Sequence, residues 1–120
     1  MKKLAPREEQ IMQVLWDKGP CFVKEIVEQL PEPKPHYNSV STMVRILETK
    51  GFIGHEAFGK SHRYHAVVLK EDYQVKAVKD VLGSYFNNSL SDMVAFFAKS
   101  ENVDEEELKD IVKIIKNKKS

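Results

Sequence analysis

The sequence lacks the features that mark secreted, membrane-bound or disulfide-stabilised proteins. Of its 120 residues only Cys21 is a cysteine, so no intramolecular disulfide forms, which agrees with a reducing cytoplasm. No apolar run reaches the roughly 20 residues that a membrane-spanning helix needs, and no signal peptide precedes the first expected helix. We therefore expect a cytoplasmic protein with one small domain, or one domain and an appendage.

The sequence also lacks the motifs that commonly support catalysis. It has no Gly-rich phosphate loop, no nucleophile elbow and no His-Glu-x-x-His spacing. Cys21 has no credible base beside it and is better interpreted as a small buried apolar residue. We expect no enzymatic activity, no small-molecule substrate and no cofactor.

Four histidines, at positions 36, 55, 62 and 65, are the main candidates for metal ligands. A metal site needs side chains that converge on one point, with carboxylate or cysteine support. His62 and His65 are three residues apart on an expected strand, so they face opposite sides. We expect no metal site, and histidines that face phosphate or are half-buried.

The net charge of +1 is small for a protein that binds nucleic acid, but the charge is unevenly distributed. Residues 1–70 contain 11 Lys or Arg and 8 Asp or Glu, whereas residues 71–120 contain 8 and 10. Residues 34–63 alone contain 5 basic and 2 acidic residues. This local positive potential predicts salt-dependent binding to nucleic acid.

Residues 37–52 (YNSVSTMVRILETKGF) have the pattern of an amphipathic helix that ends at Gly51. Its apolar stripe consists of Val40, Met43, Val44 and Leu47. The opposite face carries short hydroxyl and amide groups with one arginine, so this helix can approach the floor of the DNA major groove. The residues expected to contact bases are Asn38, Ser39, Ser41, Thr42 and Arg45. A polar face without a partner is the plainer alternative.

A hairpin is expected directly after this helix. Two half-buried strands, marked by Ile53, Phe58, Tyr64 and Val67, flank a turn at Gly59-Lys60. The basic end of the hairpin suits contact with the sugar-phosphate backbone, as does the positive N-terminus of the preceding helix. The residues expected to contact the backbone are Lys34, His36, Tyr37, Lys60, Ser61, His62 and Arg63. For Lys34 and His36, a solvated turn is an equal alternative.

Two helices precede the recognition helix. The first begins near Pro6 and ends at Gly19-Pro20, and the second spans residues 23–30 before a proline-rich turn. Helix, helix, turn, recognition helix and hairpin together define a winged helix-turn-helix. The expected fold is mainly α with a small β-hairpin wing: a winged-helix DNA-binding domain at residues 1–70 and a three-helix dimerisation region at residues 71–120.

The apolar spacing in residues 71–120 predicts three short helices. Their combined apolar surface is larger than the three helices can enclose by themselves. Ser89 or Ser91 is expected to cap the second helix, and Asp104 with Glu107 the third. A homodimer with interlocking tails covers this surface, with Phe96 and Phe97 as its central anchor; packing against the winged domain is the alternative. The stripe residues are Tyr73, Val78, Val81, Leu82, Tyr85, Leu90, Met93, Val94, Phe96, Phe97, Leu108, Ile111, Val112 and Ile115.

These expectations combine into a function. Two copies related by a two-fold axis read a palindrome of double-stranded DNA, with half-sites spaced in steps of roughly 10 base pairs. Such a dimer, bound at an operator, blocks polymerase and acts as a transcriptional repressor. The rival interpretation is a winged-helix module that binds another protein.

Two segments of the chain also resemble a known family. Residues 4–16 (LAPREEQIMQVLW) are similar to its opening, L-t-x-x-E-x-x-I-M-x-x-L-W, and residues 39–51 (SVSTMVRILETKG) to its T-V-x-T-x-L-x-R-L-x-x-K-G. Both motifs are typical of the penicillinase-repressor, or BlaI/MecI/CopY, family of winged-helix repressors. Ser39 and Ile46 depart from the pattern, which has Thr and Arg at these positions.

The resemblance implies a homodimer and a route for lifting repression. A membrane sensor-protease responds to a β-lactam and signals for cleavage of the tail, at an Asn-Phe bond in well-known members. The corresponding region here is Ala95, Phe96 and Phe97, which lacks the asparagine, so another protease or inducing signal is an alternative. Residues 71–120 contain no cysteine, which excludes the copper-binding hook of the copper-responsive branch.

Overall fold

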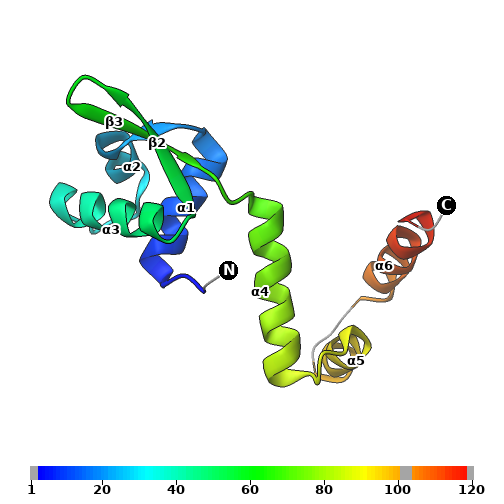
Figure 1. Ribbon diagram of the computed structural model, residues 1–120. Coiled ribbons are helices and arrows are strands. Elements are labelled where there is room, and N and C mark those ends of the chain that lie inside the picture. Colours follow the sequence, from blue (N-terminus) through cyan, green and yellow to red (C-terminus); the bar gives the residue numbers. More distant parts are fainter. Residues whose placement is uncertain (1–2, 101–103, 119–120) are drawn as a thin grey trace. The chain divides into compact units, whose positions relative to one another are not determined.

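The computed structural model describes residues 3–100 and 104–118 (Figure 1). Its elements are α1 (Pro6–Lys18), β1 (Cys21–Phe22), α2 (Val23–Gln29), α3 (Tyr37–Thr49), β2 (Ile53–Phe58), β3 (Ser61–Ala66), α4 (Lys70–Tyr85), α5 (Leu90–Ser100) and α6 (Glu105–Lys118). This mainly helical architecture with a small sheet confirms the expected fold class. The chain divides into two compact units, Met1–Ala77 and Val78–Ser120. No described helix is both long and apolar enough to cross a membrane.

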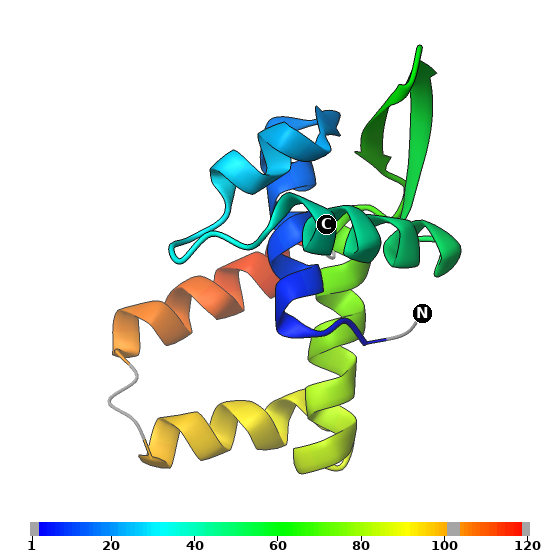
Figure 2. The same ribbon diagram turned by 90° about the vertical axis from the view of Figure 1, so that its left-hand side faces the viewer.

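Figure 2 shows the arrangement of α1, α2, α3 and the hairpin in the first unit. One apolar core holds them together, to which α1, α2, α3 and the sheet all contribute. The large side chains that are completely enclosed are Phe52, Ile11, Met12, Ile26, Leu47, Val40 and Val44. Three of them come from α3, and Met43 packs beside them, which confirms the apolar stripe predicted for this helix. The opposite face of α3 is therefore left to solvent.

The sheet has three antiparallel strands in the order β1-β3-β2. β2 and β3 form the predicted hairpin, in which Phe58 pairs with Ser61 across a two-residue turn and Gly59 has a φ of 60°. β1 pairs with the middle of β3. The sequence pattern does not predict β1, because two residues are too few to show an alternation of apolar and polar positions.

Gly51 ends α3 in the left-handed conformation expected of it, with a φ of 86°. Its amide donates to the carbonyl of Glu48 at 3.0 Å, and the amide of Phe52 donates to the carbonyl of Leu47 at 3.0 Å. These two bonds form a Schellman motif, which is accompanied by burial of both Phe52 and Leu47 in the core. The motif fixes the direction in which the chain leaves the recognition helix for the wing.

Tyr73 anchors the first turns of α4 within the first unit. Its ring is 8% exposed and lies beside Trp16 and Phe52, with centroid separations of 5.7 and 6.1 Å. Its hydroxyl donates to Glu9 Oε1 at 2.8 Å and accepts the Leu4 amide at 3.3 Å. The prediction that Tyr73 belongs to a dimerisation stripe is therefore wrong, since the core of its own chain already covers the ring.

The second unit contains the end of α4 together with α5 and α6, which confirms the three helices predicted after the wing. Ser89 Oγ accepts the Asp92 amide at 3.0 Å, and Asp104 Oδ1 accepts the Glu106 amide at 3.0 Å, so both residues cap their helices as expected. No side chain described between residues 78 and 117 is buried. Its exposed large apolar residues are Val78, Val81, Tyr85, Leu90, Phe96, Phe97, Ile111, Val112, Ile114 and Ile115.

Candidate nucleic-acid interface

The solvent-facing side of α3 carries the side chains that sequence reasoning assigned to base contact. Asn38, Ser39, Thr42 and Arg45 are exposed, and Ser41 is half-buried. Because the opposite stripe is enclosed in the core, the helix is held rigidly with this face outward. Short side chains allow its backbone to approach a groove floor closely, which long charged side chains would prevent.

Hydrogen bonds along α3 determine which groups this face offers to a ligand. The Thr42 hydroxyl donates to the Asn38 carbonyl at 3.0 Å, and Arg45 Nε donates to the Ser41 carbonyl at 3.4 Å. The hydroxyl proton of Thr42 is thus used, so the side chain presents acceptor lone pairs and a methyl group. The bond from Arg45 uses only one of the five N–H groups of its guanidinium, and its orientation along the helix is set by that bond.

The wing is tied to the end of the recognition helix by a side-chain cluster. His55 Nδ1 on β2 lies 2.6 Å from Glu48 Oε2 on α3. The His55 ring stacks on His62 from β3, with centroids 4.2 Å apart and planes within 9° of parallel. These contacts link helix and hairpin through their exposed sides, in addition to the buried core beneath them.

Tyr64 lies at the base of this cluster. Burial raises the pKa of its hydroxyl, the nearby Glu48 carboxylate raises it further, and the Arg45 guanidinium acts in the opposite direction. Tyr64 therefore stays a neutral phenol close to the exposed face of α3. The cluster places α3 and the wing around one shared groove.

That groove, of about 610 Å³, lies among α2, α3 and the end of the hairpin. Its lining residues are Phe22, Val23, Lys24, Glu25, Tyr37, Ser41, Arg45, Lys60, Ser61, His62 and Tyr64. Six of the residues predicted to contact DNA therefore meet around one concave surface, although the chain separates the two groups by 15 residues or more. The other predicted residues on α3, Asn38, Ser39 and Thr42, do not line it.

Lys24 is the cation that sequence reasoning misses. It lies at the start of α2, is exposed, and lines the groove together with Arg45 and Lys60. In the sequence it stands alone between Cys21 and a Glu-rich helix, far from the basic segment that draws attention to residues 34–63. Its proximity to the wing becomes evident only when β1 pairs with β3.

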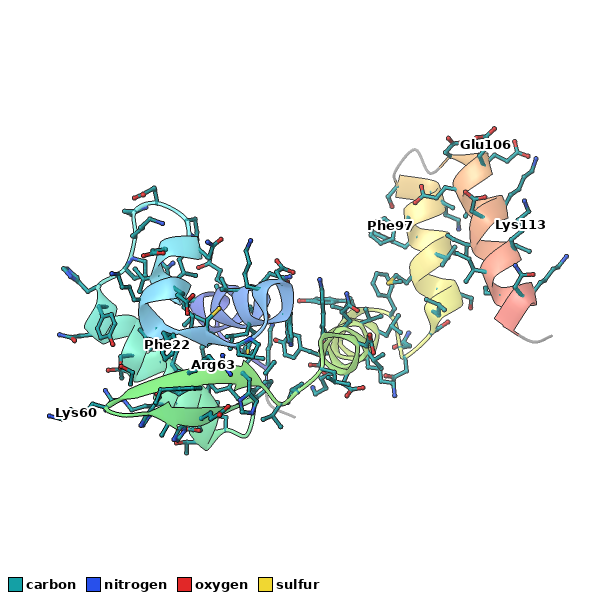
Figure 3. All side chains as sticks on the ribbon, turned by 90° about the horizontal axis from the view of Figure 1, so that it is seen from above. Phe22, Lys60, Arg63, Phe97, Glu106 and Lys113 are labelled. Carbon is teal, nitrogen blue, oxygen red and sulfur yellow. The ribbon has the colours of Figure 1, made fainter. Side chains whose placement is uncertain are left out.

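Two of the predicted backbone contacts have partners within the chain. Lys34 Nζ donates to the carbonyls of Glu28 and Leu30 at 2.8 and 2.9 Å, and so caps the C-terminal end of α2. Arg63 lies 3.6 Å from Glu56 and 4.9 Å from the centre of the Phe58 ring, on the sheet face opposite His62. Lys60, by contrast, extends from the end of the hairpin (Figure 3). Contact of Lys34 and Arg63 with phosphate stays a prediction.

The N-terminus of α3 lies beside the groove. His36 is the N-cap and makes no side-chain capping bond, and both His36 and Tyr37 are exposed. Amide groups in a first helical turn point outward and attract anions. This geometry is compatible with the predicted phosphate contacts of His36 and Tyr37.

The structure describes the surroundings of Cys21 and the placement of the histidines. Cys21 is 5% exposed, and burial together with the charge of Glu25 raises the pKa of its thiol, while Lys18 acts in the opposite direction. Among the described residues, no group of three His, Cys, Asp or Glu side chains is placed to hold a metal ion. His62 and His65 lie on opposite faces of β3, as their spacing predicts.

An ion pair holds the C-terminal end of the recognition helix against α1. Lys50 Nζ lies 2.9 Å from Glu8 Oε2, and Glu8 Oε1 accepts the Ala5 amide at 2.9 Å. Burial by itself raises the pKa of Glu8, but the Ala5 amide and the Lys50 ammonium outweigh it, and the pKa is lowered from the ordinary value of 4.5. The carboxylate thus remains charged wherever the protein is folded near neutral pH.

We expect Glu8→Gln to lower the free energy of unfolding at pH 7 by about 1–3 kcal/mol, because the variant loses a charge-assisted hydrogen bond and leaves Lys50 unpaired. Since folding lowers the pKa of Glu8, its contribution is present above the unfolded-state pKa and is lost as the pH falls through the lower folded-state pKa. The difference between the two proteins should therefore shrink in acid. Urea unfolding at pH 7 and at pH 3–4, with the exposed Glu105→Gln as control, measures it; an equal difference at both pH values would contradict the assignment.

The first unit, with an enclosed α1–α2–α3 core, a hairpin beside α3 and a cationic groove between them, defines a winged-helix DNA-binding transcription regulator. The whole chain is similar in fold to the structure of hsRosR-S4, with a TM-score of 0.58 and 13% identity over 98% of this chain and 90% of that one. The penicillinase repressor model matches residues 4–117, and the chain belongs to that family.

Named relatives agree with this membership. The methicillin resistance regulatory protein MecI of Staphylococcus aureus (strain N315) is 21% identical over 117 residues, which are 97% of this chain and 95% of the relative. The penicillinase repressor of Staphylococcus aureus is 25% identical over 120 residues, with the same coverage. The resemblance inferred from the two sequence motifs is thereby confirmed.

Proposed function

We propose that this protein represses transcription as a homodimer that binds a palindromic operator, with one α3 and one wing in each half-site. The observation that carries the proposal is the groove on which Arg45 and Ser41 of α3 meet Lys60 and His62 of the wing. In this arrangement α3 reads bases, while cations at the groove edge contact phosphate. A protein with this role needs no catalytic group and acts in the cytoplasm, where bacterial DNA lies.

The apolar surface of the second unit supports the dimer. Ten large apolar side chains between residues 78 and 115 are exposed in a single chain, more than a monomeric protein usually leaves uncovered in one region. A second copy offers the same apolar surface, and in a dimer with a two-fold axis each copy covers this surface of the other. Dimerisation also supplies the second half-site contact at high effective concentration.

Salt dependence tests DNA binding against the alternative of a protein-binding module. Lys24, Lys60 and Arg63 provide three cations per copy, hence six phosphate contacts per dimer. Six contacts correspond to a loss of affinity of about 10³-fold between 50 and 200 mM salt. Filter binding of the full chain to selected duplexes at both salt concentrations measures the loss of affinity. Lys60→Ala should make the affinity less dependent on salt, whereas the control Lys109→Ala on α6 should leave the salt dependence unchanged. Absence of duplex binding at low salt would remove the proposal.

We further propose that the regulated genes concern β-lactam resistance, as the names of the relatives suggest, and that proteolysis in α5 lifts repression. Within one chain α5 buries no side chain, so in the proposed dimer only the contacts with the second copy hold this helix, and cleavage requires that these contacts open locally. A cut in the region of Ala95, Phe96 and Phe97 separates α6 from the DNA-reading unit. A membrane sensor-protease is the proposed source of the signal, and a regulator with another inducing signal is the alternative.

Cleavage has a direct test in cells that carry this protein with its natural sensor. After addition of a β-lactam, we expect immunoblots to show a shorter band, and mass spectrometry to place its new C-terminus between Ala95 and Phe97. An untreated culture is the control. If the band stays intact while the target genes are induced, another signal operates.

A further inference from the structure

α3 exposes two large apolar side chains, Tyr37 in its first turn and Ile46 near its C-terminal end. Ile46 is 45% exposed, whereas Val40, Val44 and Leu47 are fully enclosed, so the core of the first unit does not need it. A single exposed apolar residue is ordinary on a protein surface. What distinguishes Ile46 is its place next to Arg45, at the edge of the face that the proposed function sets against DNA.

The neighbours of Ile46 make its surroundings apolar as well. Thr42 lies one turn before it and Thr49 almost one turn after it, and the three residues line a shallow depression of about 370 Å³ with Arg45 and Lys50. The Thr42 hydroxyl donates to the Asn38 carbonyl and the Thr49 hydroxyl to the Arg45 carbonyl, each at 3.0 Å. Both hydroxyls are therefore turned toward the helix backbone, which leaves the two methyl groups to flank Ile46.

The chemistry of the depression restricts what can occupy it. Its surface is largely apolar, and Arg45 adds a positive charge to it, whereas Lys50 is already paired with Glu8. An apolar surface beside a guanidinium favours an apolar group on a polyanion over an apolar protein surface. In the major groove the apolar group is the C5-methyl of thymine, whereas an isoleucine cannot provide the paired hydrogen bonds by which an arginine reads guanine.

We propose that Ile46, flanked by the methyl groups of Thr42 and Thr49, contacts a thymine methyl in each operator half-site and so specifies an A·T pair at that position. This assignment rests on the proposed function, because it requires α3 to lie in the major groove. It deepens that function by separating two kinds of readout on one helix: Arg45 recognises a hydrogen-bonding pattern, and Ile46 recognises a methyl group.

Uracil substitution tests the proposal without disturbing the hydrogen bonds of the operator. The operator is first selected from random duplexes with the full-length protein. Each thymine of the half-site is then replaced in turn by deoxyuridine, which removes only the methyl group. At one thymine, and at its symmetry mate, we expect affinity to fall roughly fourfold per half-site, the value of one buried methyl group. The Ile46→Ala variant should bind the thymine and uracil duplexes equally.

Two controls separate this proposal from the function on which it rests. Ile46 is exposed and alanine is a stronger helix former, so the variant should fold; Val67→Ala, which removes an exposed apolar side chain outside α3, should keep the sensitivity to uracil. Tight binding of the selected operator without sensitivity to uracil at any position overturns the assignment of Ile46 and leaves the repressor function intact. Binding by Ile46→Ala that is still weakened by uracil also overturns the assignment of Ile46 and leaves the repressor function intact. Failure to select any duplex overturns both.

Discussion

Replacing both Phe96 and Phe97 by aspartate should convert the protein into a monomer and lower its affinity for the full operator by about 10²- to 10⁴-fold, the advantage of a linked second site. Both rings are exposed in the single chain, and their centroids lie 5.8 Å apart on α5. Phe97 projects from α5 on the side away from α6 (Figure 3). Burying two carboxylates in an apolar dimer surface is far more costly than leaving them in water.

Sedimentation and gel-shift measurements separate this effect from damage to the DNA-reading unit. The double variant should sediment as a monomer, while its affinity for an isolated half-site stays at the wild-type value. Lys99→Asp is the matched control, because it changes the net charge of α5 by the same amount without removing an apolar side chain. A double variant that remains dimeric would show that the chains associate through another surface.

The faces of the helices were accessible from the sequence because each is determined by contacts within a few turns. The α3 stripe at Val40, Val44 and Leu47 follows the helical period, and Gly51 is the residue that a left-handed helix end prefers. The same local logic gives the caps at Ser89 and Asp104. Patterns of this kind need no knowledge of which elements touch.

Features that depend on the meeting of distant segments were not accessible. The pairing of β1 with β3, the ion pair between Glu8 and Lys50, and the burial of Tyr73 against Trp16 all join residues more than 40 positions apart. Tyr73 shows the consequence most clearly. Its spacing fits the apolar stripe of α4, but the first turns of that helix belong to the first unit, and the period alone cannot say which neighbour covers it.

The residues of the candidate site also fall into those that the sequence pattern predicts and those that it does not. The site's residues on α3 follow from the polar face, whereas the sidedness of the wing depends on strand register. His62 and Arg63 are adjacent, so they must face opposite sides of β3, but only the register places His62 toward α3 and Arg63 beside Glu56. Lys34 shows another limit: the sequence gives its charge, but not that the carbonyls at the end of α2 lie within reach of its amine.

Arg45→Ala should remove most of the preference of the dimer for its operator over random DNA. A bidentate arginine–base contact contributes about 1–3 kcal/mol of discrimination, and the two-fold axis doubles it, so the expected loss is about 30-fold to 10⁴-fold. The side chain lies at the centre of the exposed face of α3, and its Nε bond to the Ser41 carbonyl directs the guanidinium along that face. Competition gel shifts with operator and scrambled duplexes give the ratio directly.

Arg63→Ala provides the matched control, because it removes the same guanidinium from the outer face of the wing. A residue that contacts only phosphate contributes equally to every duplex, so Arg63→Ala should weaken binding to operator and scrambled DNA by the same factor. Sedimentation should show both variants as dimers, since neither residue lies in the second unit. The opposite outcome is that Arg45→Ala keeps the operator preference and Arg63→Ala loses it. The wing would then read the base sequence and α3 would only position the protein on the duplex, which reverses the roles that the exposed faces of the two elements suggest.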